Sequence, residues 1–348
     1  MSEETLLDVE RALQEFLPAK WEEGALNDFL GSSAFERDKE AIKASLTEPI
    51  RDLIFRGGKR LRPVLFLTLV EGFDLKRGQY LDLAVAIELI HNGTLAVDDV
   101  EDSSTLRRGK PALHTTYGVD VALNAGNAMY FLPLAAFVKQ DSNLSDSQRL
   151  RIFEIYSQEM INVHFGQAID IHWHKELPES VTQDQYLEMC RLKTGSLMRM
   201  SVRFACAVAG QDAENEQMFT RFAESTGIAF QIKDDVLDLT ADPKTFGKQY
   251  GNDIQEGKLS LPVIFAIEEL SSAEASRLRD ILRMHTQEAE RINEARSLIL
   301  KTSAIKRATD YASELFEQAW KGMGKDVLNT EGYGKLQQLV EMLSKREW

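Results

Sequence analysis

The chain has 348 residues, of which 43% are hydrophobic and 28% charged, and its formal net charge at pH 7 is −14. This acidic balance argues against a nucleic-acid or anionic-membrane partner, because such partners require a surplus of Lys and Arg. Two cysteines, Cys190 and Cys206, lack metal-site spacing and indicate buried thiols in a reducing compartment. The acidic N-terminus has no signal-peptide core, and no apolar run approaches the length of a membrane span. We therefore expect a cytoplasmic protein without stable membrane insertion.

Helical periodicity dominates the chain, and no segment shows the alternation of a half-buried strand. We predict an all-α protein with a single domain over residues 1–348 and an N-terminal helical extension at residues 1–35, although two smaller domains could also bury a core. Pro63 falls in a first helical turn, whereas Pro133 falls inside a helix and should kink it. The irregular segment 240–257 is expected to be a functional lid. The expected helices cover residues 4–16, 36–56, 62–73, 77–104, 119–139, 146–173, 183–208, 211–239, 261–269, 272–283, 287–323 (with a break left open) and 330–345.

A basic segment, Gly-Gly-Lys-Arg-Leu-Arg, occupies residues 57–62. Its two glycines let the backbone approach a bulky anion, and a helix that begins nearby would direct free N–H groups toward it. The spacing excludes a Walker A loop, which needs Gly-x-x-x-x-Gly-Lys-Ser/Thr after a strand. Taken alone, such a charge run is more often a solvated basic turn.

Two Asp-Asp-x-x-Asp motifs follow apolar helical runs, one at residues 98–102 and the other at residues 234–238. On a helix, positions i and i+4 share a face and i+1 lies beside it, so we expect each motif to bring three carboxylates together. Such a cluster repels itself unless cations neutralise it, and hard oxygen ligands suit Mg²⁺. Arg107 and Arg108 lie close behind the first motif and could contact phosphate oxygens, although an arginine pair at a helix end is more often a salt-bridged cap. Two facing acidic clusters therefore suggest a polyphosphate held between metals.

Together these segments resemble the trans-isoprenyl diphosphate synthases, the polyprenyl synthetase family, and most of all the geranylgeranyl diphosphate synthases. The resemblance also rests on Glu88-Leu-Ile-His91, Leu106-Arg-Arg-Gly109, Gly166-Gln167-Ala-Ile-Asp170, Lys193-Thr194-Gly195, Phe230-Gln231 and Gly251-Asn-Asp253-Ile-Gln-Glu-Gly-Lys258. It implies an antiparallel helical bundle around a deep central cavity, the isoprenoid synthase type I fold, with the two acidic motifs facing each other across the mouth. It also implies a homodimer that uses Mg²⁺, with three ions per active site in the family, to join isopentenyl diphosphate to allylic diphosphates head to tail (1′-4).

The resemblance assigns a role to each motif residue. Direct Mg²⁺ ligands would be Asp98, Asp102 and Asp234, and the supporting carboxylates would be Asp99, Asp235 and Asp238. The allylic diphosphate would be bound by Arg107, Lys193, Thr194, Gln231, Lys248 and Lys258, of which Lys193 and Lys258 also count as catalytic. Isopentenyl diphosphate would be bound by Gly58, Lys59, Arg62, His91 and Arg108. The family mechanism implies that released diphosphate accepts the final proton.

Product length should depend on the helix below the first acidic motif, because the growing tail extends away from the metals. Gly93 and Thr94 lie about one helical turn before Asp98, and the small Gly93 should leave the cavity open. Met129 and Tyr130, with the neighbouring Phe131, could form a deeper floor. A twenty-carbon product is expected, and longer polyprenyl products stay open.

Other interpretations compete with these assignments. A single His on an apolar helix is usually a core histidine, and only the Glu-x-x-His pattern favours a functional His91. Gln167 and Asp170 could equally form a buried polar pair. A class I terpene cyclase would not need the basic segment at residues 57–62. A non-catalytic partner subunit would be expected to lose acidic ligands, yet all six aspartates are present.

Overall fold

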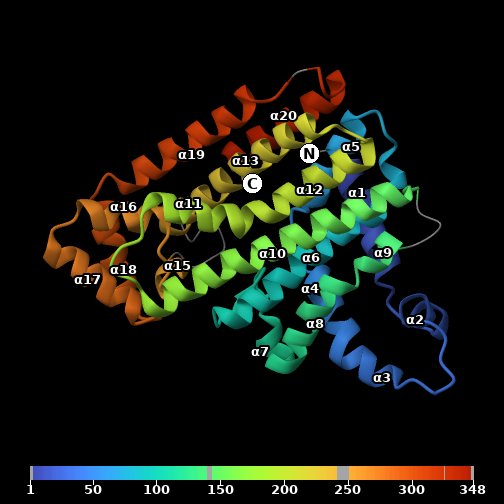
Figure 1. Ribbon diagram of the computed structural model, residues 1–348. Coiled ribbons are helices and arrows are strands. Elements are labelled where there is room, and N and C mark those ends of the chain that lie inside the picture. The colour runs from blue at the N-terminus through green and yellow to red at the C-terminus, as the bar shows by residue number, and fades with distance from the viewer. Residues whose placement is uncertain (1–2, 139–142, 241–250, 325, 346–348) are drawn as a thin grey trace. The chain divides into compact units, whose positions relative to one another are not determined.

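The computed structural model describes residues 3–138, 143–240, 251–324 and 326–345, and these residues are almost entirely helical (Figure 1). The predicted all-α fold is confirmed. The helices are α1 (Glu3–Phe16), α2 (Glu23–Leu30), α3 (Lys39–Ile42), η1 (Lys43–Thr47), α4 (Glu48–Ile54), α5 (Leu61–Gly72), η2 (Arg77–Gln79), α6 (Leu81–Glu101), α7 (Leu113–Tyr117), α8 (Val119–Phe131), α9 (Leu134–Val138), α10 (Asp146–Glu176), α11 (Gln183–Leu192), α12 (Thr194–Ala209), α13 (Ala213–Thr240), α15 (Asn252–Gln255), α16 (Leu261–Glu269), α17 (Ser272–Arg283), α18 (Ala289–Leu300), α19 (Ala304–Lys321) and α20 (Thr330–Lys345).

The chain divides into two compact units. The first unit comprises residues 1–156, 200–212 and 325–338, and the second comprises residues 157–199, 213–324 and 339–348. The first acidic motif lies in the first unit and the second motif in the second unit. That residues 1–348 act as one functional domain stays a prediction.

The first unit is built around α6, which packs along α8 and also contacts α5 and α1 (Figure 1). Most α6 side chains from Leu83 to Ile90 are buried on every side of the helix. A helix that is apolar all round belongs in the interior of a bundle. The central position of α6 fixes where its C-terminal aspartates lie.

The second unit is built around α13, which packs along α19 for much of its length (Figure 1). Capping boxes start two of its other helices: Thr182 and Gln185 cap α11, and Ser271 and Glu274 cap α17. Each box satisfies backbone N–H groups that a first helical turn leaves without partners. Local sequence therefore sets these helix starts, while α11 packs against α13 and α17 packs against α16 and α18.

Most helix predictions are confirmed, but several details differ. The chain breaks at Pro133 between α8 and α9, as expected, and Pro63 lies in the first turn of α5. The predicted helix 183–208 is wrong, because Lys193 separates α11 from α12, and α2 and α7 were missed. Residues 287–323 do break, into α18 and α19. Of the expected lid, residues 241–250 lie outside the described residues, and α15 follows them.

A two-stranded hairpin, β1 (Leu106–Arg107) with β2 (Lys110–Pro111), was also missed. Its turn residues, Arg108 and Gly109, both have positive φ values of 54° and 73°. Two consecutive left-handed residues are what a tight hairpin turn needs. The turn lies directly behind the first acidic motif and sets where the two arginines project.

One apolar stretch, Val119–Val138, has the length and mean hydropathy (1.4) of a membrane-spanning helix. The prediction that no run approaches that length is therefore wrong. The stretch spans α8 and α9, Pro133 interrupts it, and 44% of its residues are buried within the protein. A core helix of a soluble protein can have the same length and mean hydropathy, so a single stretch of this kind does not establish a membrane span.

Candidate active site

The basic loop before α5 has a strained, fixed backbone. Gly57, Gly58 and Arg60 have φ values of 89°, 142° and 48°. A Cβ atom on Gly58 would lie 3.1 Å from the Arg108 guanidinium, so only glycine lets that side chain pass so close to the loop. Arg108 also donates a hydrogen bond to the Leu53 carbonyl at 3.1 Å. The loop backbone and the Arg108 side chain therefore hold each other in place.

Arg60 turns away from solvent and holds the loop from inside. Its side chain is fully buried and forms ion pairs at 2.7 Å with Glu10 on α1 and Glu88 on α6. It also donates to the Ile54 carbonyl at 2.6 Å. Of the three cations in the loop, Arg60 thus has a structural role. The sequence did not predict this role.

Arg62 and His91 meet beside this loop, with Arg62 Nη1 3.2 Å from His91 Nε2. Burial lowers the pKa of Arg62 to about 10, partly offset by Glu88. Burial and then the neighbouring arginines, Arg62 and Arg108 first, lower the pKa of His91 well below its ordinary value. The His91 ring is therefore neutral at pH 7 and can accept from Arg62. The buried Nε of Arg62 has no hydrogen-bond partner among the described residues. This concentrated positive charge, with a donor to spare, suits an anion.

The first acidic motif does not gather all three carboxylates. Asp99 is buried and forms a bidentate pair with Arg107, whose Nε lies 2.9 Å from Asp99 Oδ1. Burial raises the pKa of Asp99, while Arg107 opposes the shift. Asp98 and Asp102 are half-buried and one turn apart, linked by a 2.8 Å backbone hydrogen bond. Arg107 therefore contacts the motif itself, through Asp99.

The second motif shows the same division. Asp235 is buried and accepts from Tyr186 Oη at 2.6 Å, from Gln231 Nε2 at 3.0 Å and from the Leu261 backbone at 3.3 Å. Asp238 accepts from two backbone N–H groups at the start of α15, each at 3.1 Å. Burial raises the pKa of Asp235 and of Asp238 to about 6, against the effect of these hydrogen bonds. Asp234 is half-buried beside them.

The expectation that each motif converges three carboxylates is therefore wrong. Among the described residues, no group of three or more His, Cys, Asp or Glu side chains is arranged to hold a metal ion. The reason is that Asp99 of the first motif binds Arg107 of the β1–β2 hairpin, while Asp235 and Asp238 of the second motif bind groups on other helices. Mg²⁺ commonly takes only one or two carboxylates and completes its shell with water and substrate phosphates. Asp98 and Asp102 in the first unit, and Asp234 in the second, are half-buried carboxylates of the kind that Mg²⁺ takes as ligands.

A linked set of polar residues surrounds the second motif. Lys193 Nζ pairs with Asp170 at 2.6 Å, and Thr194 Oγ1 donates to Gln231 Oε1 at 2.8 Å. Gln231 in turn donates to Asp235, so Thr194 and Asp235 belong to one network. Lys258 pairs with Glu256 at 2.5 Å. Lys248 lies outside the described residues.

The expectation that Gly93 leaves open space is wrong. A Cβ atom there would lie 2.9 Å from the Gly126 carbonyl and 3.0 Å from Met129 and Tyr130, because α6 and α8 cross in close contact at this point. Met129 and Tyr130 are buried beside Gly93, whereas Phe131 is 65% exposed and does not line a floor there. Thr94 Oγ1 is folded back to the His91 carbonyl at 2.7 Å.

Known proteins of one family match most of the chain. The Polyprenyl synthetase family model matches residues 43–299, which include every motif from the basic loop to Lys258. The chain belongs to the polyprenyl synthetase family. The predicted resemblance is confirmed, and this polyprenyl synthetase family member is a prenyltransferase.

Individual members of the polyprenyl synthetase family agree with this result. The chain is 37% identical over 264 residues to a short chain isoprenyl diphosphate synthase of Methanocaldococcus jannaschii, covering 75% of this chain and 76% of the relative. It is 33% identical over 279 residues, 80% of each protein, to geranylgeranyl pyrophosphate synthase 2 of Zymoseptoria tritici. The crystal structure of geranylgeranyl pyrophosphate synthetase from Pyrococcus horikoshii superimposes with a TM-score of 0.83 at 28% identity, covering 99% of this chain and 97% of that one.

Proposed function

We propose that this prenyltransferase condenses isopentenyl diphosphate head to tail (1′-4) with allylic diphosphates and makes geranylgeranyl diphosphate. The observation that carries the proposal is a cation group of the first unit, Arg62 and Arg108 with the neutral His91, at α6, the helix that carries the first acidic motif. The relatives named as geranylgeranyl diphosphate synthases support the twenty-carbon product. Longer-chain products stay an outcome of the test.

The cation group would hold isopentenyl diphosphate. Arg62 offers an Nε donor that has no partner among the described residues, and Arg108 is held against Gly58, where the glycine leaves room for a close backbone approach. Lys59 is exposed next to them and would close over the diphosphate. Neutral His91 keeps Arg62 oriented without adding charge. A terpene cyclase also has Asp-rich motifs, but it would not need this cation group.

The acidic residues would hold the allylic diphosphate through Mg²⁺. Asp98, Asp102 and Asp234 are the proposed ligands, and three ions per site is the number that the family implies. Bound Mg²⁺ would supply electrostatic stabilisation of the charge that develops on the departing diphosphate. Lys193, Thr194, Gln231, Lys258 and Lys248 would contact the same leaving group, although Lys193, Thr194 and Gln231 also hydrogen-bond within the protein. Arg107 would act through Asp99, to which it is bound.

We further propose a cytoplasmic homodimer. In the first unit, α8 and α9 expose Phe131 and Val138, and the part of α10 that belongs to this unit exposes Leu150. Each of these side chains is more than half exposed, and exposed apolar patches often mark protein interfaces. Light scattering coupled to size exclusion should give twice the mass of the 39.4 kDa chain. A monomer mass at micromolar concentration would contradict the dimer.

The proposed activity is tested by product analysis. The purified protein is incubated with isopentenyl diphosphate, Mg²⁺ and, separately, dimethylallyl, geranyl and farnesyl diphosphates, and the dephosphorylated products are separated by length. We expect geranylgeranyl diphosphate from every primer and no condensation after chelation of Mg²⁺. Cyclic hydrocarbons would indicate a cyclase instead, and the absence of any product would indicate a non-catalytic subunit.

A further inference from the structure

The corner between α11 and α12, at Lys193, is clamped between two other helices. A Cβ atom on Gly166 of α10 would lie 2.4 Å from the Lys193 backbone nitrogen. A Cβ atom on Gly227 of α13 would lie 3.3 Å from Gly195 Cα. The corner therefore touches both helices through its backbone, and its position depends on how α10 and α13 are held.

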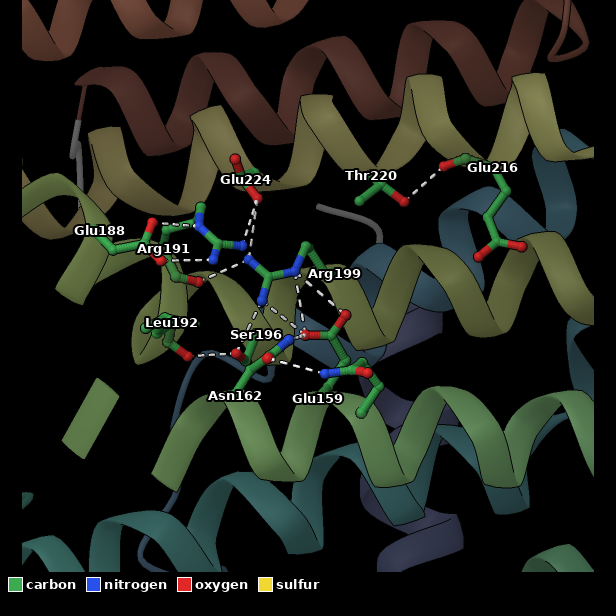
Figure 2. Close-up of polar contacts among 11 residues, drawn as sticks. Glu159, Asn162, Glu188, Arg191, Leu192, Ser196, Arg199, Glu216, Thr220 and Glu224 are labelled. Atoms are coloured by element: carbon green, nitrogen blue, oxygen red, sulfur yellow. Dashed lines mark hydrogen bonds and ion pairs between the residues drawn. The ribbon is translucent and has the colours of Figure 1, made fainter. Parts of the chain in front are cut away.

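One buried guanidinium joins all the elements at this corner. Figure 2 shows Arg199 of α12 between Glu159 of α10 and Glu224 of α13. Arg199 Nη2 lies 2.8 Å from Glu159 Oε2, and Arg199 Nη1 lies 3.2 Å from Glu224 Oε2. The Arg199 and Glu159 side chains are 4% and 1% exposed. Two carboxylates from different helices thus meet on a single cation.

The same guanidinium also completes the end of α11. Arg199 Nη1 donates to the Arg191 carbonyl at 2.7 Å, and Arg199 Nη2 donates to Ser196 Oγ at 3.0 Å (Figure 2). Ser196 Oγ in turn donates to the Leu192 carbonyl. Carbonyl groups in the last turn of a helix need partners beyond that helix. Arg199 and Ser196 supply them, so these two residues determine where α11 stops.

The corner carries two residues that face the proposed allylic site. Lys193 Nζ is held by Asp170, and Thr194 Oγ1 is linked through Gln231 to Asp235 of the second acidic motif. Both side chains start from the backbone that Arg199 holds. A shift of about 1 Å in such groups can lower turnover by about two orders of magnitude.

We propose that Arg199 is a positioning residue for the allylic diphosphate site: with Glu159 and Glu224, it sets the α11–α12 corner and so places Lys193 and Thr194. This inference rests on the proposed function. The alternative is a purely structural ion pair. Buried pairs can often be replaced by apolar residues of similar volume without loss of stability, so stability and positioning can be separated.

The decisive variant removes both charges at once. Arg199→Met with Glu159→Met removes the buried guanidinium and its buried carboxylate partner together at similar volume, while Glu224, 31% exposed, can still approach Arg191 at 3.7 Å. We expect a folded protein whose KM for farnesyl diphosphate rises about tenfold or more, with KM for isopentenyl diphosphate unchanged. Arg199→Lys keeps the charge but not the planar fork of the guanidinium. Its KM for farnesyl diphosphate should therefore lie between the values for the wild type and the double variant.

The matched control is Arg277→Met with Glu294→Met, which removes a bidentate pair between α17 and α18. It should leave both KM values unchanged. Circular dichroism and thermal melting of every variant show whether the fold is kept. If the Arg199 double variant keeps the wild-type allylic KM, or if both KM values change equally, the positioning role is overturned.

Calorimetry separates this inference from the proposed activity. Inorganic diphosphate with Mg²⁺ is titrated into the wild-type protein, the Arg199 double variant and Lys193→Ala. If the wild type binds but does not condense prenyl diphosphates, the proposed activity fails, while weaker binding by both variants would still support the role of Arg199. Equal binding by all three proteins would overturn it, as would the absence of binding by the wild type.

Discussion

Replacing Asp98 with alanine should lower the rate of condensation by at least about 10³-fold. Asp98 is half-buried at the end of α6, and Asp99 beside it is already bound to Arg107, so Asp99 cannot take over as a ligand. Asp102 would then be the last proposed ligand of the first motif. Steady-state kinetics with saturating Mg²⁺ measure the loss, and circular dichroism shows whether the variant is folded.

The matched control for this variant is Asp82→Ala, at the opposite end of the same helix. Asp82 is an acidic residue of the first turn of α6 and belongs to no proposed site, so turnover should stay near the wild-type rate. A near-normal rate for Asp98→Ala would contradict the metal assignment. Rescue of Asp98→Ala by high Mg²⁺ would instead indicate that Asp98 contributes only affinity.

Replacing Gly93 with phenylalanine should destabilise the first unit by more than about 3 kcal/mol, at or above the usual range for overpacking. The Cβ atom alone would meet the Gly126 carbonyl at 2.9 Å, and that carbonyl is backbone that cannot rotate away. The ring would have to separate α6 from α8, the helices at the centre of this unit. Denaturant unfolding followed by circular dichroism measures the loss in the free energy of unfolding. Insolubility of the variant is the other expected result.

Gly334→Phe is the matched control, because Gly334 also lies in a helix but has no atom within 4 Å of an added Cβ. It should unfold at nearly the wild-type denaturant concentration. Tyr130→Ala is the informative change for product length: Tyr130 is buried against Gly93, and removing its ring should shift the products toward longer chains. A stable Gly93→Phe variant that makes a shorter product would show that the tail does pass position 93.

Local sequence carried a large part of this structure. The helices, the kink at Pro133 and the first turn at Pro63 follow from periodicity and proline geometry, which act within a few residues. The same holds for the order of the basic loop and the two acidic motifs, on which the family resemblance rested. Such features depend on residues that are close in the chain, so they can be predicted from the sequence before the fold is known.

The roles inside each motif depend on partners far away in the sequence. Asp235 is bound by Tyr186, which lies 49 positions earlier, and Arg60 is bound by Glu10, 50 positions earlier. No local pattern distinguishes these side chains from their neighbours, since consecutive aspartates or arginines have the same chemistry. What separates them is burial, which makes an unpaired charge costly and so requires a partner.

The sequence by itself therefore determined the all-α class, the sites where acids and cations concentrate, and the family. Only the tertiary structure decided which protein groups bind Asp99, Asp235 and Asp238, that Gly93 is a helix contact rather than an opening, and that α11 ends at Lys193, where Arg199 caps it. The physical reason is that periodicity and turn propensity are local. Close helix crossings and buried ion pairs exist only after residues from distant segments have packed together.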